Sequence, residues 1–241
     1  KRYIPPKFTH ILATLALILM PVLLIVKQPD LGTAILIFAS GCFVLFLAGL
    51  RKRYLISAFL MAVAAIPSLW FFVMRDYQKQ RVLTLLSPED DKLGAGWNII
   101  QSTTAIGSGG LNGKGWTLGT QSQLNFLPES HTDFIIAVLA EEFGLIGVLT
   151  LCAAYLLLIG RCMVIALNSQ SQFGRLIAGS LSLTFFIYVF VNMSMVSGIL
   201  PVVGVPLPLI SYGGTAIVTL FLGFGILMAI STEPKRIRIE L

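Results

Sequence analysis

Long apolar runs constrain the fold of this chain more than any other feature of its sequence. Several runs reach about 18 residues, the length that a helix needs to cross a hydrocarbon layer about 30 Å thick. Of the 241 residues, 56% are hydrophobic and 12% are charged, whereas soluble domains carry about 25% charged residues. Because backbone polar groups in lipid must be satisfied within the segment, the runs predict helices. We therefore expect an all-α polytopic membrane protein.

Six transmembrane helices are predicted within a single membrane domain that covers residues 1–241. They are expected at residues 9–26, 31–50, 54–74, 134–160, 176–199 and 213–231. Residues 75–133 form a long loop between the third and fourth helices, and loops longer than about 15 residues are uncommon unless they are functional or disordered. Within this loop, residues 97–106 suit a short interfacial helix.

The basic residues predict the orientation of the chain. With the N-terminus in the cytoplasm, 11 of the 17 Lys and Arg residues face the cytoplasm in short inter-helix loops and at the termini, as the positive-inside rule requires. These are Lys1, Arg2, Lys7, Arg51, Lys52, Arg53, Arg161, Arg175, Lys235, Arg236 and Arg238. Only Lys27 lies in a short outer turn, because Arg75, Lys79, Arg81, Lys92 and Lys114 belong to the long loop. Both termini are therefore expected in the cytoplasm and loop 75–133 outside, and the net charge of +6 does not indicate nucleic-acid binding.

A second irregular element is predicted after the fifth helix. The stretch from Gly198 to Gly214 is apolar but contains Pro201, Pro206 and Pro208, so it cannot form one straight helix. Broken backbone at membrane depth is tolerated only where protein or a water-filled cavity surrounds it. We expect a re-entrant segment at residues 200–212 that lines an outward-facing cavity, and we expect Ser211 to cap the last helix.

Asp133 is the main candidate for chemistry. It ends the long loop and precedes the apolar span that begins at Phe134, so its carboxylate is expected where water meets an apolar cavity. A helix N-terminus there would favour the charged form. The alternative is structural, with Thr132 or Asp133 capping the helix.

Glu141 and Glu142 are expected on the same helix as Asp133, about 12 Å deeper at 1.5 Å per residue. Acidic residues at that depth are costly and generally functional. On a continuous helix, Glu141 would lie roughly 80° from Asp133 around the axis and Glu142 opposite. Either could accept hydrogen bonds from the N-terminus of the last span near residues 213–214, as a structural anchor or in catalysis.

Further polar residues are candidates with open alternatives. Arg81, Lys114 and Arg75 are candidates to hold phosphate, or they extend to lipid headgroups. Asp30 either caps the second span or has a functional role. His131 could titrate near neutral pH or serve only in hydrogen bonding. The sequence has no Walker loop, no His/Cys metal cluster and no Ser/His/Asp set in a familiar context, so no organic cofactor is expected.

Four stretches resemble the SEDS family of bacterial cell-wall proteins (RodA/FtsW-like), above all RodA of Gram-negative bacteria. They are QPDLGT (28–33), GAGWNIIQS with AIGSGG (94–110), FLPESHTDF with EEFG (126–134 and 141–144) and LPLISYGG (207–214). The resemblance extends over essentially the whole chain.

The resemblance implies a peptidoglycan glycosyltransferase that polymerises lipid II in the inner membrane during cell elongation. Asp133 falls on the essential aspartate of the family, in what would be a periplasmic loop. Within the matching motifs and the loop, the predicted substrate contacts are Arg81, Gln101, Lys114, Glu129, His131 and Ser211, with Asp30, Glu141 and Glu142 as supporting polar residues. A divalent cation (Mg²⁺ or Mn²⁺), a class B penicillin-binding protein and other membrane proteins of the elongation complex are the implied partners.

Family members have about ten spans, and the first span here resembles their fifth. We therefore expect four preceding helices, among them a lysine partner for Asp30, and no cleaved signal peptide after Lys1-Arg2. Two other functions stay open at this point. A lipid flippase or transporter would explain the broken segment and the intramembrane acids, and a non-catalytic scaffold would dock a cell-wall partner.

Overall fold

The computed structural model describes residues 6–28, 30–91, 94–124, 126–127 and 129–233. Within these residues, every regular element is helical. In chain order the elements are α1 (Phe8–Lys27), α2 (Leu31–Leu47), α3 (Lys52–Ser68), a π-helical turn η1 (Leu69–Val73), α4 (Asp76–Leu86), a 3₁₀ turn η2 (Pro88–Asp90), α5 (Ala95–Gly109), α6 (Thr120–Gln123), α7 (Ile135–Asn168), α8 (Gln172–Val196) and α9 (Gly214–Ser231).

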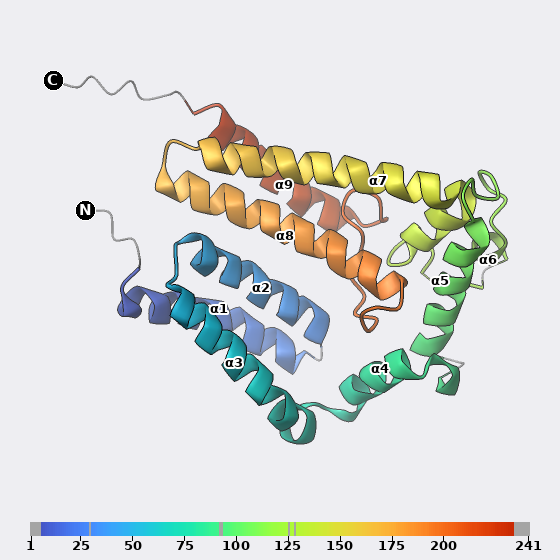
Figure 1. Cartoon of the computed structure of the whole chain (residues 1–241), viewed down its shortest axis with the longest axis horizontal. Helices are drawn as coiled ribbons and strands as arrows, with labels where there is room; N and C mark the ends of the chain where they lie inside the picture. The colour runs from blue at the N-terminus through green and yellow to red at the C-terminus, as the bar shows by residue number, and fades with distance from the viewer. Residues whose placement is uncertain (1–5, 29, 92–93, 125, 128, 234–241) are drawn as a thin grey trace.

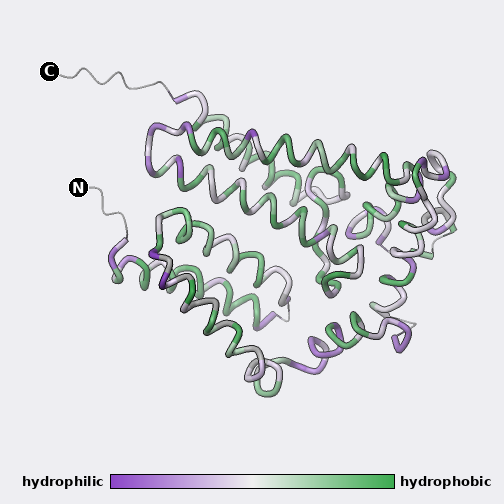
Figure 2. Tube along the Cα trace, viewed as in Figure 1, coloured by the Kyte–Doolittle hydropathy of each residue, from purple (hydrophilic) through white to green (hydrophobic). Residues whose placement is uncertain are grey.

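The helices confirm the predicted class of an all-α, multi-pass membrane protein. By length and composition, α1, α7, α8 and α9 are able to cross a membrane. Figure 2 shows the corresponding long apolar stretches along these helices. The second and third predicted spans are shorter, because α2 and α3 have 17 residues each, which is the lower end of the range for a span. Pro67 lies near the end of α3, where the chain changes to the π-helical turn.

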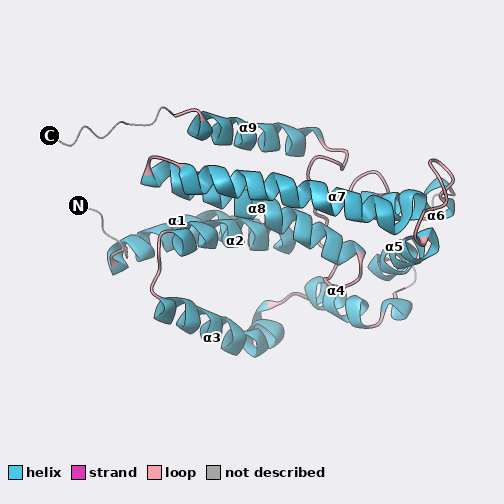
Figure 3. Cartoon of the chain, turned by 45° about the horizontal axis from the view of Figure 1, so that its top comes forward, coloured by secondary structure: helices cyan, strands magenta, loops and turns pink. Residues whose placement is uncertain are grey.

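Five helices form a bundle, and the segment between α3 and α7 covers one end of it. Helices α1, α2, α7, α8 and α9 run roughly along a common direction, while α3 diverges from them (Figures 1 and 3). Helices α4 and α5 lie at the end where α7 and α9 begin. The turns that join α2 to α3 and α7 to α8 lie at the opposite end. The arrangement separates the loop between α3 and α7 from these two short connections.

The boundaries of α7 and α8 differ from the prediction. Arg161 lies inside α7 and Arg175 inside α8, so their placement in an inter-helix loop was wrong. Hydropathy marks where lipid ends, whereas a helix continues as long as its backbone hydrogen bonds do. The connection is only three residues long, and Ser171 ends it by accepting a hydrogen bond from the backbone of Gly174 at 2.9 Å. Lys1, Arg2, Lys92, Lys235, Arg236 and Arg238 lie outside the described residues.

The core connects α7, α8 and α9 to the non-helical segment between α8 and α9. Phe185 stands between Tyr155 and Phe224, with ring centroids 5.9 and 5.6 Å apart, a spacing typical of favourable aromatic pairs. The Tyr155 hydroxyl donates to the Pro208 carbonyl at 2.6 Å. This bond satisfies a buried polar group and holds the irregular segment against α7.

Candidate active site

Asp133 lies in a turn that precedes α7. Residues 129–133 form turns, and α7 begins at Ile135 with Phe134 as its N-cap residue and no side-chain cap. Thr132 donates its hydroxyl to Glu129 Oε2 at 2.7 Å. Neither Thr132 nor Asp133 therefore caps the helix, and the structural alternative for Asp133 was wrong. Its carboxylate is free for another role.

The carbonyls of residues 131–133 are each held from inside the bundle. The His131 carbonyl accepts from the backbone N–H of Tyr212 at 2.9 Å. The Thr132 carbonyl accepts from the hydroxyl of Ser211 at 2.5 Å. The Asp133 carbonyl accepts from the Asn192 side-chain amide at 2.8 Å. Three consecutive main-chain oxygens thus point toward α8 and residues 211–212, which fixes the path of the turn.

The half-buried Asp133 carboxylate lies against the non-helical segment. A Cβ at Gly204 would stand 3.4 Å from Asp133 Oδ2, and Gly204 has φ +72°, a conformation that favours glycine. Burial raises the pKa of Asp133 above its ordinary value, and the negative charge of Glu129 raises it further. A carboxylate with a raised pKa is a better proton acceptor once it is ionised.

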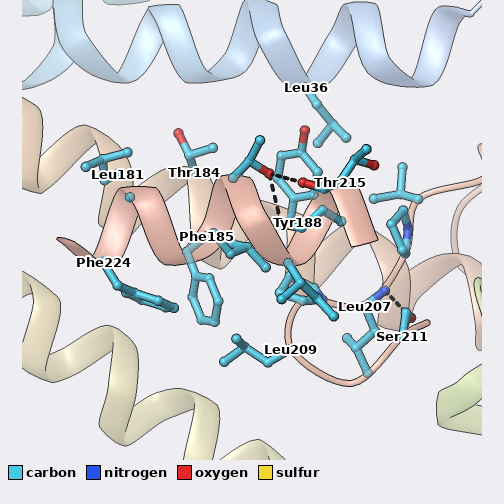
Figure 4. A pocket seen from close by; sticks show the side chains of 18 of the residues that line it. Leu36, Leu181, Thr184, Phe185, Tyr188, Leu207, Leu209, Ser211, Thr215 and Phe224 are labelled. Atoms are coloured by element: carbon cyan, nitrogen blue, oxygen red, sulfur yellow. Dashed lines mark hydrogen bonds between the residues drawn. The ribbon is translucent and has the colours of Figure 1, made fainter. Parts of the chain in front are cut away.

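Ser211 does not cap the last helix as expected. It accepts a hydrogen bond from the Leu207 backbone at 2.7 Å (Figure 4) while donating to Thr132. The N-cap residue of α9 is Gly213, without a side-chain cap. The sequence motif was recognised, but its serine closes a turn of the segment and ties it to residue 132.

A largely apolar groove of about 470 Å³ lies between α2, α8, α9 and residues 204–211. Figure 4 shows its aromatic and aliphatic side chains together with a few polar groups. The polar side chains on its lining are Thr33, Thr184, Tyr188, Ser211, Thr215 and Thr219. Gly204 and Ser211 line the groove and also contact the 132–133 turn. The carboxylate of Asp133 is therefore next to one end of an apolar groove.

Asp30 has the structural role that was one of its two interpretations. It is the N-cap residue of α2 and accepts a hydrogen bond from the Thr33 backbone at 3.0 Å. Thr33 in turn lines the groove. Ser40 of α2 and Thr184 of α8 share a hydrogen bond of 2.9 Å, which holds this wall of the groove in place.

Glu141 is fully buried and forms a second polar cluster. Its carboxylate accepts hydrogen bonds from the Lys114 ammonium at 2.7 Å, from the Thr120 backbone at 2.8 Å and from the Gln121 backbone. The expectation that it binds the N-terminus of the last span was therefore wrong. Lys114 therefore has a carboxylate partner within the chain.

The helix containing Glu141 is broken two residues beyond Glu142, which is also buried. Gly144 has φ +64° and ψ −162°, so the ladder of α7 is interrupted. Residues 110–115 occupy the break. The backbone N–H groups of Lys114 and Gly115 donate to the carbonyls of residues 141 and 142, while the N–H groups of residues 145 and 146 donate to the carbonyls of residues 110 and 111. These four backbone groups gain partners from outside the helix.

The predicted site residues thus separate into groups. Glu129, His131, Asp133 and Ser211 come together at one turn. Glu141, Glu142 and Lys114 belong to the cluster at the α7 break. Arg81 is exposed on α4, which packs on α5, and Gln101 is partly buried on α5. The described contacts do not bring Arg81 or Gln101 to the Asp133 turn. Asp133 also lies before α7, so the helical-wheel relation to the two glutamates does not apply.

Sequence reasoning missed Asn192. It lies in the middle of a predicted span, and an amide in an apolar helix is itself a signal of a specific partner. Among the described residues, no group of three or more His, Cys, Asp or Glu side chains is arranged to hold a metal ion. Asp133 and Glu129 do offer two neighbouring carboxylates, which is a set that Mg²⁺ accepts when substrate phosphates complete the coordination.

The family model described as a cell cycle protein, FtsW/RodA/SpoVE, matches residues 1–236. The chain belongs to the FtsW/RodA/SpoVE family. This confirms the resemblance found from the four motifs. Peptidoglycan glycosyltransferase MrdB of Escherichia coli (strain K12) is 62% identical over 231 residues, which are 96% of this chain and 62% of the relative. A probable peptidoglycan glycosyltransferase FtsW of Geobacter sulfurreducens is 42% identical over 94% of this chain and 60% of the relative.

Solved structures of the FtsW/RodA/SpoVE type share the fold. A chain of a structure described as coordinating polymerization and crosslinking by a peptidoglycan synthase complex superposes with a TM-score of 0.78 and 30% identity, over 93% of this chain and 62% of that chain. The rod shape determining protein RodA of Thermus thermophilus gives a TM-score of 0.62 and 28% identity, over 95% of this chain and 58% of that chain. The chain therefore spans about three fifths of the length of these relatives.

Proposed function

We propose that this protein is a peptidoglycan glycosyltransferase that polymerises lipid II during cell elongation, with Asp133 as its general base. Relatives named as peptidoglycan glycosyltransferases support the reaction class. The observation that carries the assignment of the base is the half-buried Asp133 carboxylate. Its pKa is raised, it caps no helix, and it lies beside residues that line an apolar groove.

The reaction joins two lipid-linked disaccharides. The 4-hydroxyl oxygen of one sugar forms a bond to the anomeric carbon of the other, the bond from that carbon to the pyrophosphate oxygen breaks with inversion, and Asp133 takes the hydroxyl proton. A positioned base typically contributes about 10²–10⁴-fold. Glu129 and His131 are exposed beside the base and contact the sugars, and the groove takes part of the polyprenyl chain.

The leaving pyrophosphate carries negative charge that must be offset. A Mg²⁺ or Mn²⁺ ion held by Asp133 or Glu129 and the phosphates would supply this stabilisation. The exposed Arg81 side chain is the protein cation that we assign to the same charge, and Gln101 remains a proposed substrate contact.

The proposed topology has six spans in the bacterial inner membrane. Loop 75–133 and the active site face the periplasm, both termini face the cytoplasm, and residues 200–212 form a re-entrant segment. The separation of this loop from the α2–α3 connection, which contains Arg51, and from the α7–α8 connection, which Arg175 contacts, supports this orientation (Figure 1). Residues 201–207 are not helical, Val205 contacts α8 and Pro208 contacts α7, and these observations support the re-entrant segment.

The proposed partners are a class B penicillin-binding protein and other membrane proteins of the elongation complex. The similarity to a chain of a peptidoglycan synthase complex supports a transpeptidase partner. Since the known complex couples polymerization with crosslinking, the partner would act on the glycan that this protein makes.

The test is polymerisation of purified lipid II by full-length protein carrying Asp133→Asn. We expect a loss of at least about 100-fold, while the variant still folds, with a Tm no lower than that of wild type. Asp90→Asn is the matched control, because Asp90 is an exposed carboxylate of the same outer loop. Near-normal polymerisation by the Asp133 variant would reject the assignment.

A lipid transporter is a second candidate, because transporters build their sites from discontinuous helices, and both α7 and residues 197–213 are interrupted. Translocation of labelled lipid II in liposomes that does not depend on Asp133 would favour this function. A scaffold alone predicts that partner binding and cell-wall growth both continue when Asp133 is lost.

A further inference from the structure

Asn192 of α8 connects two segments that build the site. The residue is fully buried. Its amide nitrogen donates to the Asp133 carbonyl at 2.8 Å and to the Val205 carbonyl at 2.6 Å. Because both partners are carbonyl oxygens, they identify the nitrogen end of the amide. One side chain therefore holds the turn of the base to the segment that carries Gly204.

A buried amide is a costly choice at this position unless it performs a specific task. An apolar side chain of similar size would avoid the desolvation of the amide. The Asn192 oxygen is also buried without a hydrogen-bond partner among the described residues, which adds to the cost. Ser182 of the same helix is different, because among the described residues its hydroxyl bonds only to the Ala178 carbonyl one turn earlier. By contrast, both hydrogen bonds that Asn192 donates go to residues outside its own helix, and both acceptors belong to the site.

We propose that Asn192 is a positioning residue that sets the location of the Asp133 carboxylate relative to the 204–211 wall of the groove. This inference rests on the proposed function of Asp133. Asn192 acts through the main chain of Asp133 and through Val205, and it does not touch the reacting atoms. The carbonyls of residues 131 and 132 are bonded by the Tyr212 N–H and the Ser211 hydroxyl. Asn192 supplies the corresponding hydrogen bond to the carbonyl of Asp133.

The expected effect of losing Asn192 is on the chemical step. A displacement of about 1 Å in a reacting group costs on the order of 100-fold in rate. Substrate affinity depends on the groove and the outer loop, which Asn192 does not line. Its loss should therefore lower kcat far more than it raises KM.

The experiment compares Asn192→Leu and Asn192→Asp with wild type in full-length protein. Leucine keeps most of the volume and removes both donors, and aspartate keeps the shape but removes the donors when ionised. Ser182→Ala is the matched control, since it deletes a buried polar group of α8 that contacts neither segment. Lipid II polymerisation gives kcat and KM, and hydrogen exchange by mass spectrometry follows residues 129–134 and 203–213.

We expect both Asn192 variants to lose about 10- to 100-fold in kcat with KM changed less than threefold. Backbone N–H groups of residues 207 and 212, which are bonded within this arrangement, should exchange faster, while α7 beyond residue 145 stays protected. Ser182→Ala should match wild type in both measurements.

The proposal is overturned if kcat stays within twofold of wild type, if the loss lies in KM, or if exchange rises throughout the protein. If the leucine and aspartate variants do not fold, Asn192→Ser is measured in their place. If none of the three variants folds, Asn192 serves stability alone and the positioning role is rejected. The outcome for the base is separate, because Asp133→Asn reports on it directly. An inactive Asp133→Asn protein with fully active Asn192 variants rejects this inference and keeps the proposed function.

Discussion

Asp133 is held in surroundings that disfavour its own charge. It is half-buried, and its nearest acidic neighbour, Glu129, is linked to the same turn through Thr132. The hydrogen bonds that fix the turn go to main-chain carbonyls and leave the carboxylate without that support. Such an arrangement improves proton acceptance by a general base, but it lowers the stability of the folded protein.

We expect Asp133→Asn to raise the stability of the protein at neutral pH while it removes activity. The pKa of Asp133 is raised in the folded state, so the folded form is favoured below the unfolded-state pKa and loses this advantage as pH rises through the folded-state pKa. Above that range, ionised Asp133 imposes a constant cost that asparagine avoids. Thermal unfolding in detergent at pH 7 should show a higher Tm for the variant, and the difference should vanish at a pH below the ordinary range of aspartate. A lower Tm at pH 7 would contradict it.

Glu129→Gln should shift the acid limb of activity to lower pH. Glu129 raises the pKa of Asp133, after the larger effect of burial, so removing its charge lowers the pH at which Asp133 becomes protonated. Glutamine keeps an acceptor for the Thr132 hydroxyl. The pH dependence of kcat/KM for lipid II polymerisation measures the shift. Glu89→Gln, an exposed glutamate elsewhere in the outer loop, should leave the profile unchanged, and an unmoved limb in Glu129→Gln would rule out the coupling.

For single residues, the sequence predicted the exposed and half-buried side chains of the site better than the buried residues that fix its turn. Asp133 and Glu129 were recognised from their motif, and Asp30 was interpreted partly as the cap that it is. Asn192 and the actual bonds of Ser211 were not predicted, because they join residues 59 and 79 positions apart. A pattern within one segment carries no information on such partners.

Among the helices, α7 is distinctive because residues of a loop replace some of its internal backbone hydrogen bonds. At Gly144 the helix is interrupted, and residues 110–115 satisfy the exposed carbonyl and N–H groups on both sides of the break. Lipid supplies no hydrogen bonds for such groups, so the loop and the helix must form this junction together.

Gly144→Ala and Gly160→Ala should have opposite effects although both change a glycine of α7. At Gly144 the backbone is in a region open essentially to glycine alone, and a Cβ would overlap the backbone of Leu111 and Gly113, so a loss of at least about 1–3 kcal/mol is expected. At Gly160 a Cβ meets no neighbour, and alanine should be neutral or stabilising by up to about 1 kcal/mol. Thermal unfolding of the two variants measures the difference, and equal changes in stability would contradict the helix break at Gly144.

The Lys114–Glu141 pair should respond unequally to removal of its two partners. Glu141 is fully buried, whereas the Lys114 side chain is 28% exposed. Lys114→Met therefore strands a buried charge and should cost on the order of 2–3 kcal/mol, while Glu141→Gln leaves an ammonium that reaches water and should cost less. The double variant should recover part of the Lys114→Met loss. Unfolding free energies of all four proteins form the cycle, and simple additivity would argue against the pair.

The helices themselves followed from hydropathy, since lipid imposes length and composition on a span. The predicted interfacial helix at 97–106 corresponds to α5, which is longer at both ends. The break at Gly144 was not predicted, because a glycine within an apolar run also fits a continuous helix. Its meaning became clear only from the partner loop, which lies some 30 residues earlier in the chain.

For the whole molecule, the two ends of the bundle differ in what they carry. One end has the loop between α3 and α7, the Asp133 turn and the segment between α8 and α9. The other has the short α2–α3 connection, which contains Arg51, and the short α7–α8 connection, which Arg175 contacts (Figure 1). In the proposed topology, the second end faces the cytoplasm.

Cysteine labelling should place these ends on opposite sides of the membrane. Asp90→Cys and Gln170→Cys are both exposed positions, and they are introduced singly after Cys42, Cys152 and Cys162 are replaced by alanine. A membrane-impermeant maleimide added to intact spheroplasts should modify position 90 and not position 170, and permeabilisation should expose both. Labelling of position 170 in intact cells would reverse the proposed orientation.

Residues 131–133 are held by hydrogen bonds to their main-chain oxygens, and this has an evolutionary consequence. Backbone carbonyls are common to all amino acids, so substitutions at His131 or Thr132 leave the anchors of the turn in place. Selection is then able to exchange the side chains of these residues, which we propose to face the sugar, while the carboxylate of Asp133 stays where it is. Related proteins with different glycan substrates would be reached from this architecture by small sequence changes next to an unmoved aspartate.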